Sequence, residues 1–118
     1  MAALFEQVTI VGLGLMGGSL GIAMRRHGVA KQVVGVSRKA STLAAARRLG
    51  AIDAGAHDAR HAAAEADLVV LATPVEMIIT DGPVIADAMR PGSLLTDVGS
   101  TKQLIVEALD GAQAGVGF

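Results

Sequence analysis

Three glycines at fixed spacing form the first group of residues whose pattern points to chemistry. Gly12, Gly14 and Gly17 make a G-x-G-x-x-G pattern, which follows an apolar run typical of a strand and opens a segment typical of a helix. In this context the first glycine permits a tight turn, the second lets a ligand approach the backbone, and the third lets the helix lie close to the strand. The N–H groups near Leu15 and Met16 would then bind the phosphates of a dinucleotide.

Close packing of helix on strand is the alternative interpretation of these glycines. Each glycine inside a helix costs about 1 kcal/mol relative to alanine, so a helix this rich in glycine needs a compensating reason. Gly18 and Gly21, which follow the pattern, are expected to serve packing alone. We therefore interpret the first three glycines as a phosphate-binding turn and the last two as packing positions.

The residues after the second apolar run bear on which dinucleotide is bound. An NAD site places Asp or Glu about 20 residues after the glycine turn, where it binds the ribose 2′-hydroxyl. Here that position holds Ser37, followed by Arg38 and Lys39, with Thr42 shortly after. A hydroxyl and a guanidinium would bind a 2′-phosphate through charge-assisted hydrogen bonds, whereas a carboxylate would repel it. The pattern favours NADP over NAD, unless these cations belong only to a solvated loop.

Two further segments end apolar runs and would meet the same crevice. Thr73 and Pro74 follow the run over 68–72, and they either line the nicotinamide side of the crevice or simply end the strand. Ser100 pairs with Gln103 as a helix-capping box. The same hydroxyl, held at a helix N-terminus beside the crevice, would be suited to binding a substrate oxygen.

Acid–base and metal chemistry find little support in the sequence. His57 and His61 are four residues apart, but no third ligand lies near them, so no zinc site is expected. Neither these nor His27 resembles a catalytic base. The sequence therefore predicts a cofactor site without visible acid–base machinery.

The elements that must position these residues alternate between strand and helix. Apolar runs predict strands at 7–11, 33–36, near Ala54, at 68–72 and at 94–97. Helices are predicted at 15–27, 41–49 with Ser41 as the N-cap, near Ala62, at 75–89 with an interruption at Gly82-Pro83, and at 101–109. Apolar strands that alternate with helices indicate a parallel sheet covered on both faces. We predict one α/β domain over 1–118, a Rossmann-type doubly wound fold with a mainly parallel sheet.

Composition excludes several classes of protein. The 118 residues are 52% hydrophobic, carry a net charge of -1, and include no cysteine and only 2% aromatic residues. Such a chain is neither disordered nor disulfide-stabilised, and it lacks the basic excess of a nucleic-acid-binding protein. Residues 7–24 carry no charge, but their glycines and the strand-to-helix change argue against a membrane span or a signal peptide. A cytoplasmic protein is expected.

Four motifs in chain order carry a family resemblance. They are the glycine turn with its continuation to Leu20, the Gly35-Val-Ser37-Arg38 segment, the Ala72-Thr73-Pro74-Val75 segment, and Thr96-Asp97-Val-Gly99-Ser100-Thr-Lys102. Together they resemble the prephenate/arogenate dehydrogenase family over nearly the whole chain. The last motif, with its Asp-x-x-Ser-x-Lys spacing, is the most specific of the four.

The resemblance implies NADP-dependent oxidative decarboxylation of prephenate or arogenate in tyrosine biosynthesis. In that family the serine at the position of Ser100 contacts substrate beside a histidine from a Gly-Gly-His-Pro motif, and a helical C-terminal domain forms the dimer. The present sequence contains neither that motif nor that domain. We therefore expect a cofactor-binding portion that is inactive alone, from an enzyme that is a homodimer with a small-molecule substrate.

Two other interpretations stay open at this stage. One is a β-hydroxyacid dehydrogenase of the 3-hydroxyisobutyrate type, and the other is a dinucleotide-sensing module without catalysis. The candidate cofactor-binding residues are Gly12, Leu13, Gly14, Leu15, Met16, Gly17, Ser37, Arg38, Lys39, Thr42, Ala72, Thr73, Pro74 and Gly99, and the candidate catalytic residue is Ser100.

Overall fold

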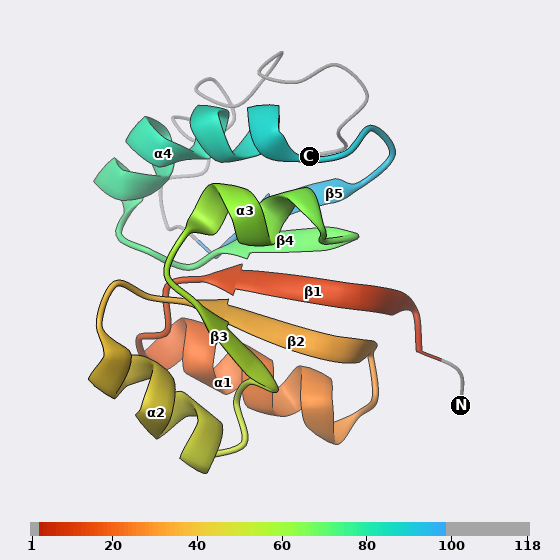
Figure 1. Ribbon diagram of the computed structural model, residues 1–118, viewed down its shortest axis with the longest axis vertical. Coiled ribbons are helices and arrows are strands. Elements are labelled where there is room, and N and C mark those ends of the chain that lie inside the picture. The colour runs from red at the N-terminus through yellow and green to blue at the C-terminus, as the bar shows by residue number, and fades with distance from the viewer. Residues whose placement is uncertain (1–2, 99–118) are drawn as a thin grey trace.

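A five-stranded sheet forms the centre of the molecule. The computed structural model describes residues 3–98. Its strands are β1 (Phe5–Val11), β2 (Ala30–Val36), β3 (Ala54–Ala56), β4 (Leu68–Leu71) and β5 (Leu94–Asp97). They lie in the order β3-β2-β1-β4-β5, and every pairing between neighbours is parallel (Figure 1). The strand order reverses direction at β1, between β2 and β4, which is where open parallel sheets bind ligands.

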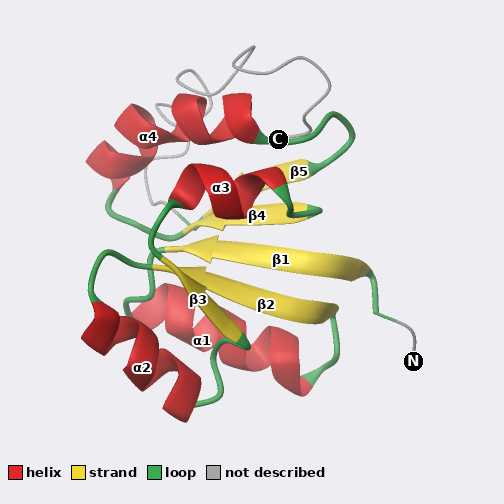
Figure 2. Ribbon diagram, in the orientation of Figure 1, coloured by secondary structure: helices red, strands yellow, loops and turns green. Residues whose placement is uncertain are grey.

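Helices cover both faces of this sheet. On one side lie α1 (Leu15–Arg26) and α2 (Ala40–Arg48), and on the other lie α3 (Ala59–Ala64) and α4 (Val75–Ala88) (Figure 2). Each parallel strand is joined to the next by a helix, as such crossovers require. The predicted Rossmann-type doubly wound fold is confirmed.

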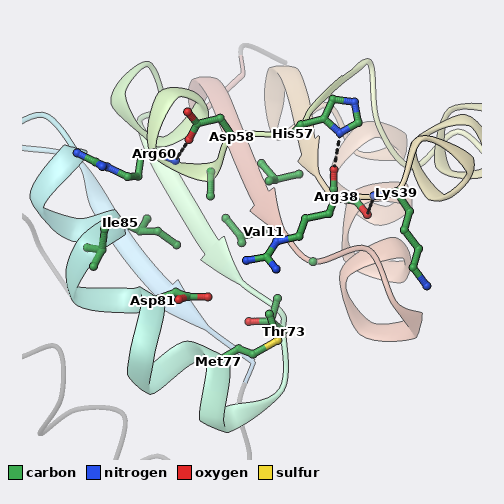
Figure 3. Close-up of a pocket in the computed structure, with 15 residues that line it drawn as sticks. Val11, Arg38, Lys39, His57, Asp58, Arg60, Thr73, Met77, Asp81 and Ile85 are labelled. Atoms are coloured by element: carbon green, nitrogen blue, oxygen red, sulfur yellow. Dashed lines mark hydrogen bonds between the residues drawn. The ribbon is translucent and has the colours of Figure 1, made fainter.

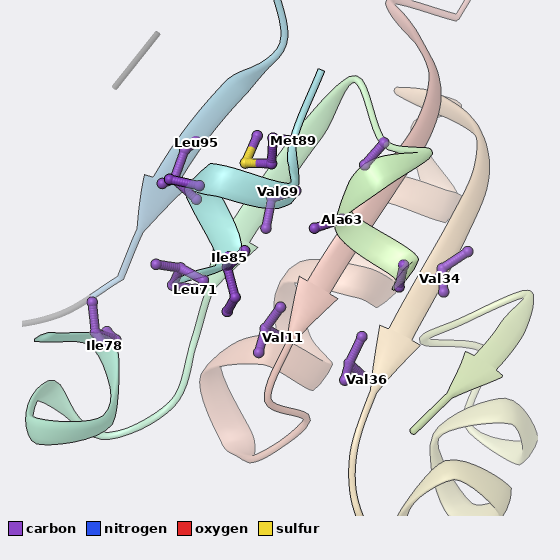
Figure 4. Close-up of a cluster of buried hydrophobic side chains, with 13 residues drawn as sticks. Val11, Val34, Val36, Ala63, Val69, Leu71, Ile78, Ile85, Met89 and Leu95 are labelled. Atoms are coloured by element: carbon purple, nitrogen blue, oxygen red, sulfur yellow. The ribbon is translucent and has the colours of Figure 1, made fainter. Parts of the chain in front are cut away.

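Side chains that alternate along each strand divide the interior into two cores. Val8 and Ile10 of β1 pack toward α1 and α2, whereas Val11 packs toward α3 and α4, where a larger cluster includes Ile78 and Ile85 (Figure 4). Thr9 is fully buried on the second face, and its hydroxyl donates a hydrogen bond to the carbonyl oxygen of Ala62 at 3.0 Å. The apolar character of both faces explains why β2 and β4 each contain a continuous run of buried residues, at 33–36 and 69–71.

The uncharged stretch at 7–24 folds into the end of β1, the glycine turn and most of α1. Within residues 3–98 no helix is long and apolar enough to cross a membrane. The helix ends as expected, because Gly28 adopts φ +64° just beyond it, a conformation that glycine tolerates best. Gly50 does the same after α2, with φ +79°.

Two local predictions about helices were wrong. The predicted interruption at Gly82-Pro83 is absent, since α4 continues through Pro83. Proline removes one helical hydrogen bond, but burial of Ile78 and Ile85 on either side stabilises the continuous helix. Ser41 is not an N-cap either, because α2 begins one residue earlier and Lys39 occupies the cap position without a side-chain bond. The helix predicted at 101–109 lies outside the described residues.

Asp67 lies just before β4 and makes hydrogen bonds at the starts of β1 and β5. Its Oδ2 atom accepts hydrogen bonds from the backbone N–H groups of Glu6 at 2.7 Å and Gln7 at 3.1 Å, and its Oδ1 atom accepts one from Arg90 at 2.9 Å. Its own carbonyl accepts from the N–H of Leu94 at 2.9 Å. The hydrogen bond from Gln7, with those from Glu6 and Arg90, holds the pKa of the Asp67 carboxyl below its ordinary value against the opposing effect of partial burial.

Replacing Asp67 should make stability less dependent on acid pH. A pKa lowered by folding means that the ionised carboxyl stabilises the fold fully above about pH 4, and that this contribution disappears as the pH falls through the folded pKa. We expect Asp67→Asn to lower the free energy of unfolding by about 1–2 kcal/mol at pH 7 and by less at pH 3. Urea unfolding at both pH values measures this. Asp87→Asn, an exposed carboxyl on α4, is the control. An equal effect of Asp67→Asn at both pH values would contradict the assignment.

Candidate dinucleotide-binding site

The glycine turn is held against the end of β4 by close backbone packing. Gly12 has φ +99°, which an L side chain rarely adopts. A Cβ atom at Gly12 would lie 2.8 Å from Thr73 Cγ2 and 3.0 Å from the carbonyl carbon of Ala72. The turn after β1 and the segment after β4 are therefore in contact, as the sequence predicted when it assigned both to one crevice.

The remaining glycines of this region divide into two groups by the space around them. A Cβ atom at Gly17 would overlap the carbonyl oxygen of Gly12, and one at Gly21 would overlap that of Ala51. Around Gly14, by contrast, no atom lies within 4 Å of the position of a Cβ, so the fold itself does not require glycine there. Gly18 also has room, since its nearest such neighbour is 4.0 Å away. The packing role predicted for Gly21 is confirmed, and that predicted for Gly18 is wrong.

The N-terminus of α1 is open to solvent at this turn. Gly14 is the N-cap, no side chain caps the helix, and the first turn carries no acidic residue. The first turn of a helix leaves its N–H groups without intrahelical partners, and the helix dipole favours an anion there. Leu15 and Met16 are 86% and 59% exposed. Leu13 points inward instead, packing against Gly35, where a Cβ would lie 2.8 Å from Leu13 Cδ1.

A cavity of about 570 Å³ lies beside the turn, at the carboxyl ends of β1, β2 and β4 (Figure 3). It brings together five predicted site residues from three separate segments. These are Gly12, Ser37, Arg38, Lys39 and Thr73. Apolar side chains such as Val11, Val36 and Ile85 form much of the rest of its wall. An apolar wall with polar groups at the rim suits a nucleoside, whose ring is flat and whose ribose and phosphates are polar.

The turn after β2 is fixed by hydrogen bonds that meet at Ser37. The N–H of Ser37 donates to the carbonyl oxygen of Ala56 at 3.1 Å, and its carbonyl oxygen lies 3.0 Å from His57 Nδ1. Its side-chain oxygen accepts from the N–H of Lys39 at 3.2 Å. With that oxygen accepting, the hydroxyl hydrogen is left to donate to an acceptor in the pocket.

The charged side chains around the cavity point in different directions. In Figure 3 the Arg38 guanidinium extends into the cavity, whereas the Lys39 side chain extends away from it. Asp81 of α4 points toward the cavity from the side opposite Arg38. Asp58 is engaged as the N-cap of α3, where its carboxylate accepts from the N–H groups of Arg60 and His61 at 3.0 and 3.4 Å. Of the two cations after β2, Arg38 is therefore the better placed to meet a ligand.

A second groove, of about 600 Å³, lies on the other side of the glycine turn between α1 and α2. Gly14 and Leu15 line it, and so does Thr42. The structure therefore does not bring Thr42 into the cavity that Ser37 and Arg38 line. The glycine turn separates the two hollows and contributes residues to both.

The other predicted residues are placed as follows. Ala72 packs beneath the glycine turn, 3.2 Å from the position of a Cβ on Gly17, and Pro74 is the exposed N-cap of α4. Gly99 and Ser100 lie outside the described residues. In the part of the chain that the structure describes, no group of three His, Asp or Glu side chains is placed to hold a metal ion.

Several cavity residues were missed by the sequence reasoning. They come from the segment after β3 and from α4, and they are His57, Asp58, Ala59, Arg60, Met77, Asp81, Val84 and Ile85. His57 was considered only as a metal ligand and as a catalytic base, although it follows a predicted strand at the edge where parallel sheets bind ligands. The α4 residues give no such signal, because a helix spacing alone does not say which face meets a cavity.

Sequence comparison identifies relatives of known class. A family profile, prephenate dehydrogenase, nucleotide-binding domain, matches residues 20–118. The prephenate dehydrogenase of Bacillus subtilis is 35% identical over 106 residues, which make up 89% of this chain and 29% of that protein. The matching family is the one that the four motifs resemble.

Solved structures agree with this assignment. Synechocystis arogenate dehydrogenase superposes with a TM-score of 0.76 at 28% identity, covering 89% of this chain and 38% of that one. Prephenate dehydrogenase from A. aeolicus, in complex with hydroxyphenyl propionate and NAD+, gives a TM-score of 0.70 at 25% identity, covering 92% and 40%. The chain thus spans 29–40% of the length of these three relatives. Its motifs, its sheet topology and these matches together show that the chain belongs to the prephenate dehydrogenase family and corresponds to the nucleotide-binding domain.

Proposed function

We propose that this chain is the NADP-binding portion of a cytoplasmic, homodimeric enzyme that oxidatively decarboxylates prephenate or arogenate. The family and the site geometry support the dinucleotide. The substrate is inferred from relatives named prephenate dehydrogenase and arogenate dehydrogenase. The absence of cysteine is compatible with a reducing compartment.

The residues present fit a dinucleotide. Gly14 has open space where a Cβ would be, beside an uncapped helix N-terminus, so a pyrophosphate can approach the backbone there. The adjoining cavity has apolar walls for the adenosine and polar groups at its rim. The bound dinucleotide supplies the hydride acceptor, and the protein binds it and fixes its orientation.

One observation carries the preference for NADP: Ser37 and Arg38 stand where an NAD site has a carboxylate. The Arg38 side chain extends into the cavity (Figure 3), and the Ser37 hydroxyl has a hydrogen to donate. Both groups are donors, and a 2′-phosphate is an acceptor only. The A. aeolicus relative was solved with NAD+, so the proposal for this chain depends on its own Ser37 and Arg38.

Substrate chemistry is proposed for Ser100 and for a histidine outside these 118 residues. The last histidine of the sequence is His61, and the Gly-Gly-His-Pro motif is not present. We assign to Ser100 the orientation of the substrate ring hydroxyl, and to that histidine the acceptance of its proton. The 118 residues by themselves would bind the dinucleotide without turning over substrate.

Calorimetric titration with NADP and NAD tests the preference. We expect NADP to bind at least about tenfold more tightly, which corresponds to about 1.4 kcal/mol. Arg38→Ala should bring the two affinities close together, because it removes a charge-assisted hydrogen bond to the 2′-phosphate. Arg48→Ala, which removes the same charge from an exposed position on α2, should keep the preference. NAD binding as tight as NADP binding to the unchanged chain would contradict the proposal.

Alanine at two glycines separates binding from folding. Gly14→Ala should change the free energy of unfolding by less than about 1 kcal/mol, yet weaken dinucleotide binding by about tenfold or more, because its methyl group occupies the space of the ligand. Gly17→Ala should destabilise the fold itself, since its methyl group overlaps the Gly12 carbonyl oxygen. Urea unfolding and calorimetry measure the two effects. A Gly14→Ala chain that binds NADP normally would show that the turn does not contact the ligand.

The absence of turnover is tested by absorbance at the NADPH band. The 118-residue chain, incubated with NADP and either prephenate or arogenate, should give no substrate-dependent signal. The physical reason is that no group in the sequence matches the histidine that accepts the hydroxyl proton. Formation of NADPH that requires either substrate would disprove this part of the proposal.

A further inference from the structure

We infer that His57 is a positioning residue that sets the preference for NADP by holding the turn of Ser37 and Arg38 in place. The inference rests on the proposed function, because it concerns how the same cavity recognises a 2′-phosphate. His57 lies in the segment between β3 and α3, twenty residues from Ser37 in sequence. It lines the cavity, and its side chain is exposed.

The imidazole makes one defined contact. His57 Nδ1 lies 3.0 Å from the carbonyl oxygen of Ser37, as the dashed line in Figure 3 marks. A carbonyl oxygen only accepts, so Nδ1 carries the hydrogen and donates it. The residue before it, Ala56, accepts from the N–H of Ser37 at 3.1 Å. Ala56 at the end of β3 and His57 just after it therefore hold both backbone polar groups of Ser37.

This contact determines the start of Arg38. The carbonyl of Ser37 and the N–H of Arg38 belong to one planar peptide group, so fixing the carbonyl fixes the plane from which Arg38 begins. Lys39, the residue after Arg38, is also restrained, because its N–H donates a hydrogen bond of 3.2 Å to the Ser37 side-chain oxygen. The direction in which the Arg38 side chain enters the cavity thus depends on the imidazole.

The effect should fall on NADP and spare NAD. Arg38 is exposed and long, so without a fixed backbone it loses more conformational freedom when it binds a phosphate. NAD has no 2′-phosphate, so its binding depends less on Arg38. His57 is itself exposed, so its removal costs the fold little. A purely structural role would instead weaken both dinucleotides together.

The experiment compares three variants by calorimetry with NADP and NAD, alongside thermal unfolding. His57→Ala should lower the affinity for NADP about three- to tenfold while changing that for NAD less than about twofold. His57→Asn should restore most of the NADP affinity, because its amide nitrogen sits where Nδ1 does and donates in the same way. His61→Ala removes an exposed histidine that does not line the cavity, and should leave both affinities unchanged.

The outcomes separate this inference from the proposed function. An unchanged chain without NADP preference would overturn both. If the unchanged chain prefers NADP and His57→Ala keeps that preference, only the role of His57 is overturned. Equal loss of both dinucleotides with a lowered unfolding temperature, or failure of His57→Asn to restore NADP binding, would also overturn it. A selective loss in His57→Ala that His57→Asn reverses supports it.

Discussion

The close approach of α1 to the sheet is the constraint on which the site depends. Gly17 lies directly against the Gly12 carbonyl and Gly21 against the Ala51 carbonyl, and a methyl group at either would force the helix away. This approach aims the open N-terminus of α1 at the crevice beside β1 and β4. Gly14 differs from these two glycines, because a side chain at Gly14 would extend into open space and would not meet the rest of the fold. Packing and binding are thus divided among glycines of one short motif.

The parallel sheet concentrates the polar residues at one edge. Because β1, β2 and β4 all end on the same side, the turns that follow them meet around one cavity, although they are far apart in sequence. The opposite edge is stabilised separately, by the hydrogen bonds of Asp67 to the starts of β1 and β5. The Asp67 hydrogen bonds therefore lie at the opposite ends of the strands from the candidate binding cavity.

Neighbouring segments form the rim of the cavity together and are joined by hydrogen bonds. Ser37 follows β2, but its backbone is held by Ala56, the last residue of β3, and by His57, which follows β3. Arg38, which follows β2, and Asp81, which lies on α4, are on opposite sides of the cavity. A ligand there would meet groups from three connections at once. The backbone of Ser37 is held by Ala56 and His57, which is how a residue that need not touch the ligand would influence what binds.

The sequence by itself determined the order of strands and helices, the doubly wound class and the glycine turn. It also determined that Ser37 and Arg38 follow the second strand, where an NAD site has a carboxylate. These are local signals, since apolar runs, glycine spacing and the residue after a strand do not require knowledge of distant neighbours. Only the tertiary structure decided that Gly18 has room, that α4 continues through Pro83, and that His57 and Asp81 line the cavity. Each of these depends on which atoms from remote segments come close. His57 follows a predicted strand, which places it at the ligand-binding edge, but the helical spacing of Asp81 does not indicate which face of α4 meets the cavity.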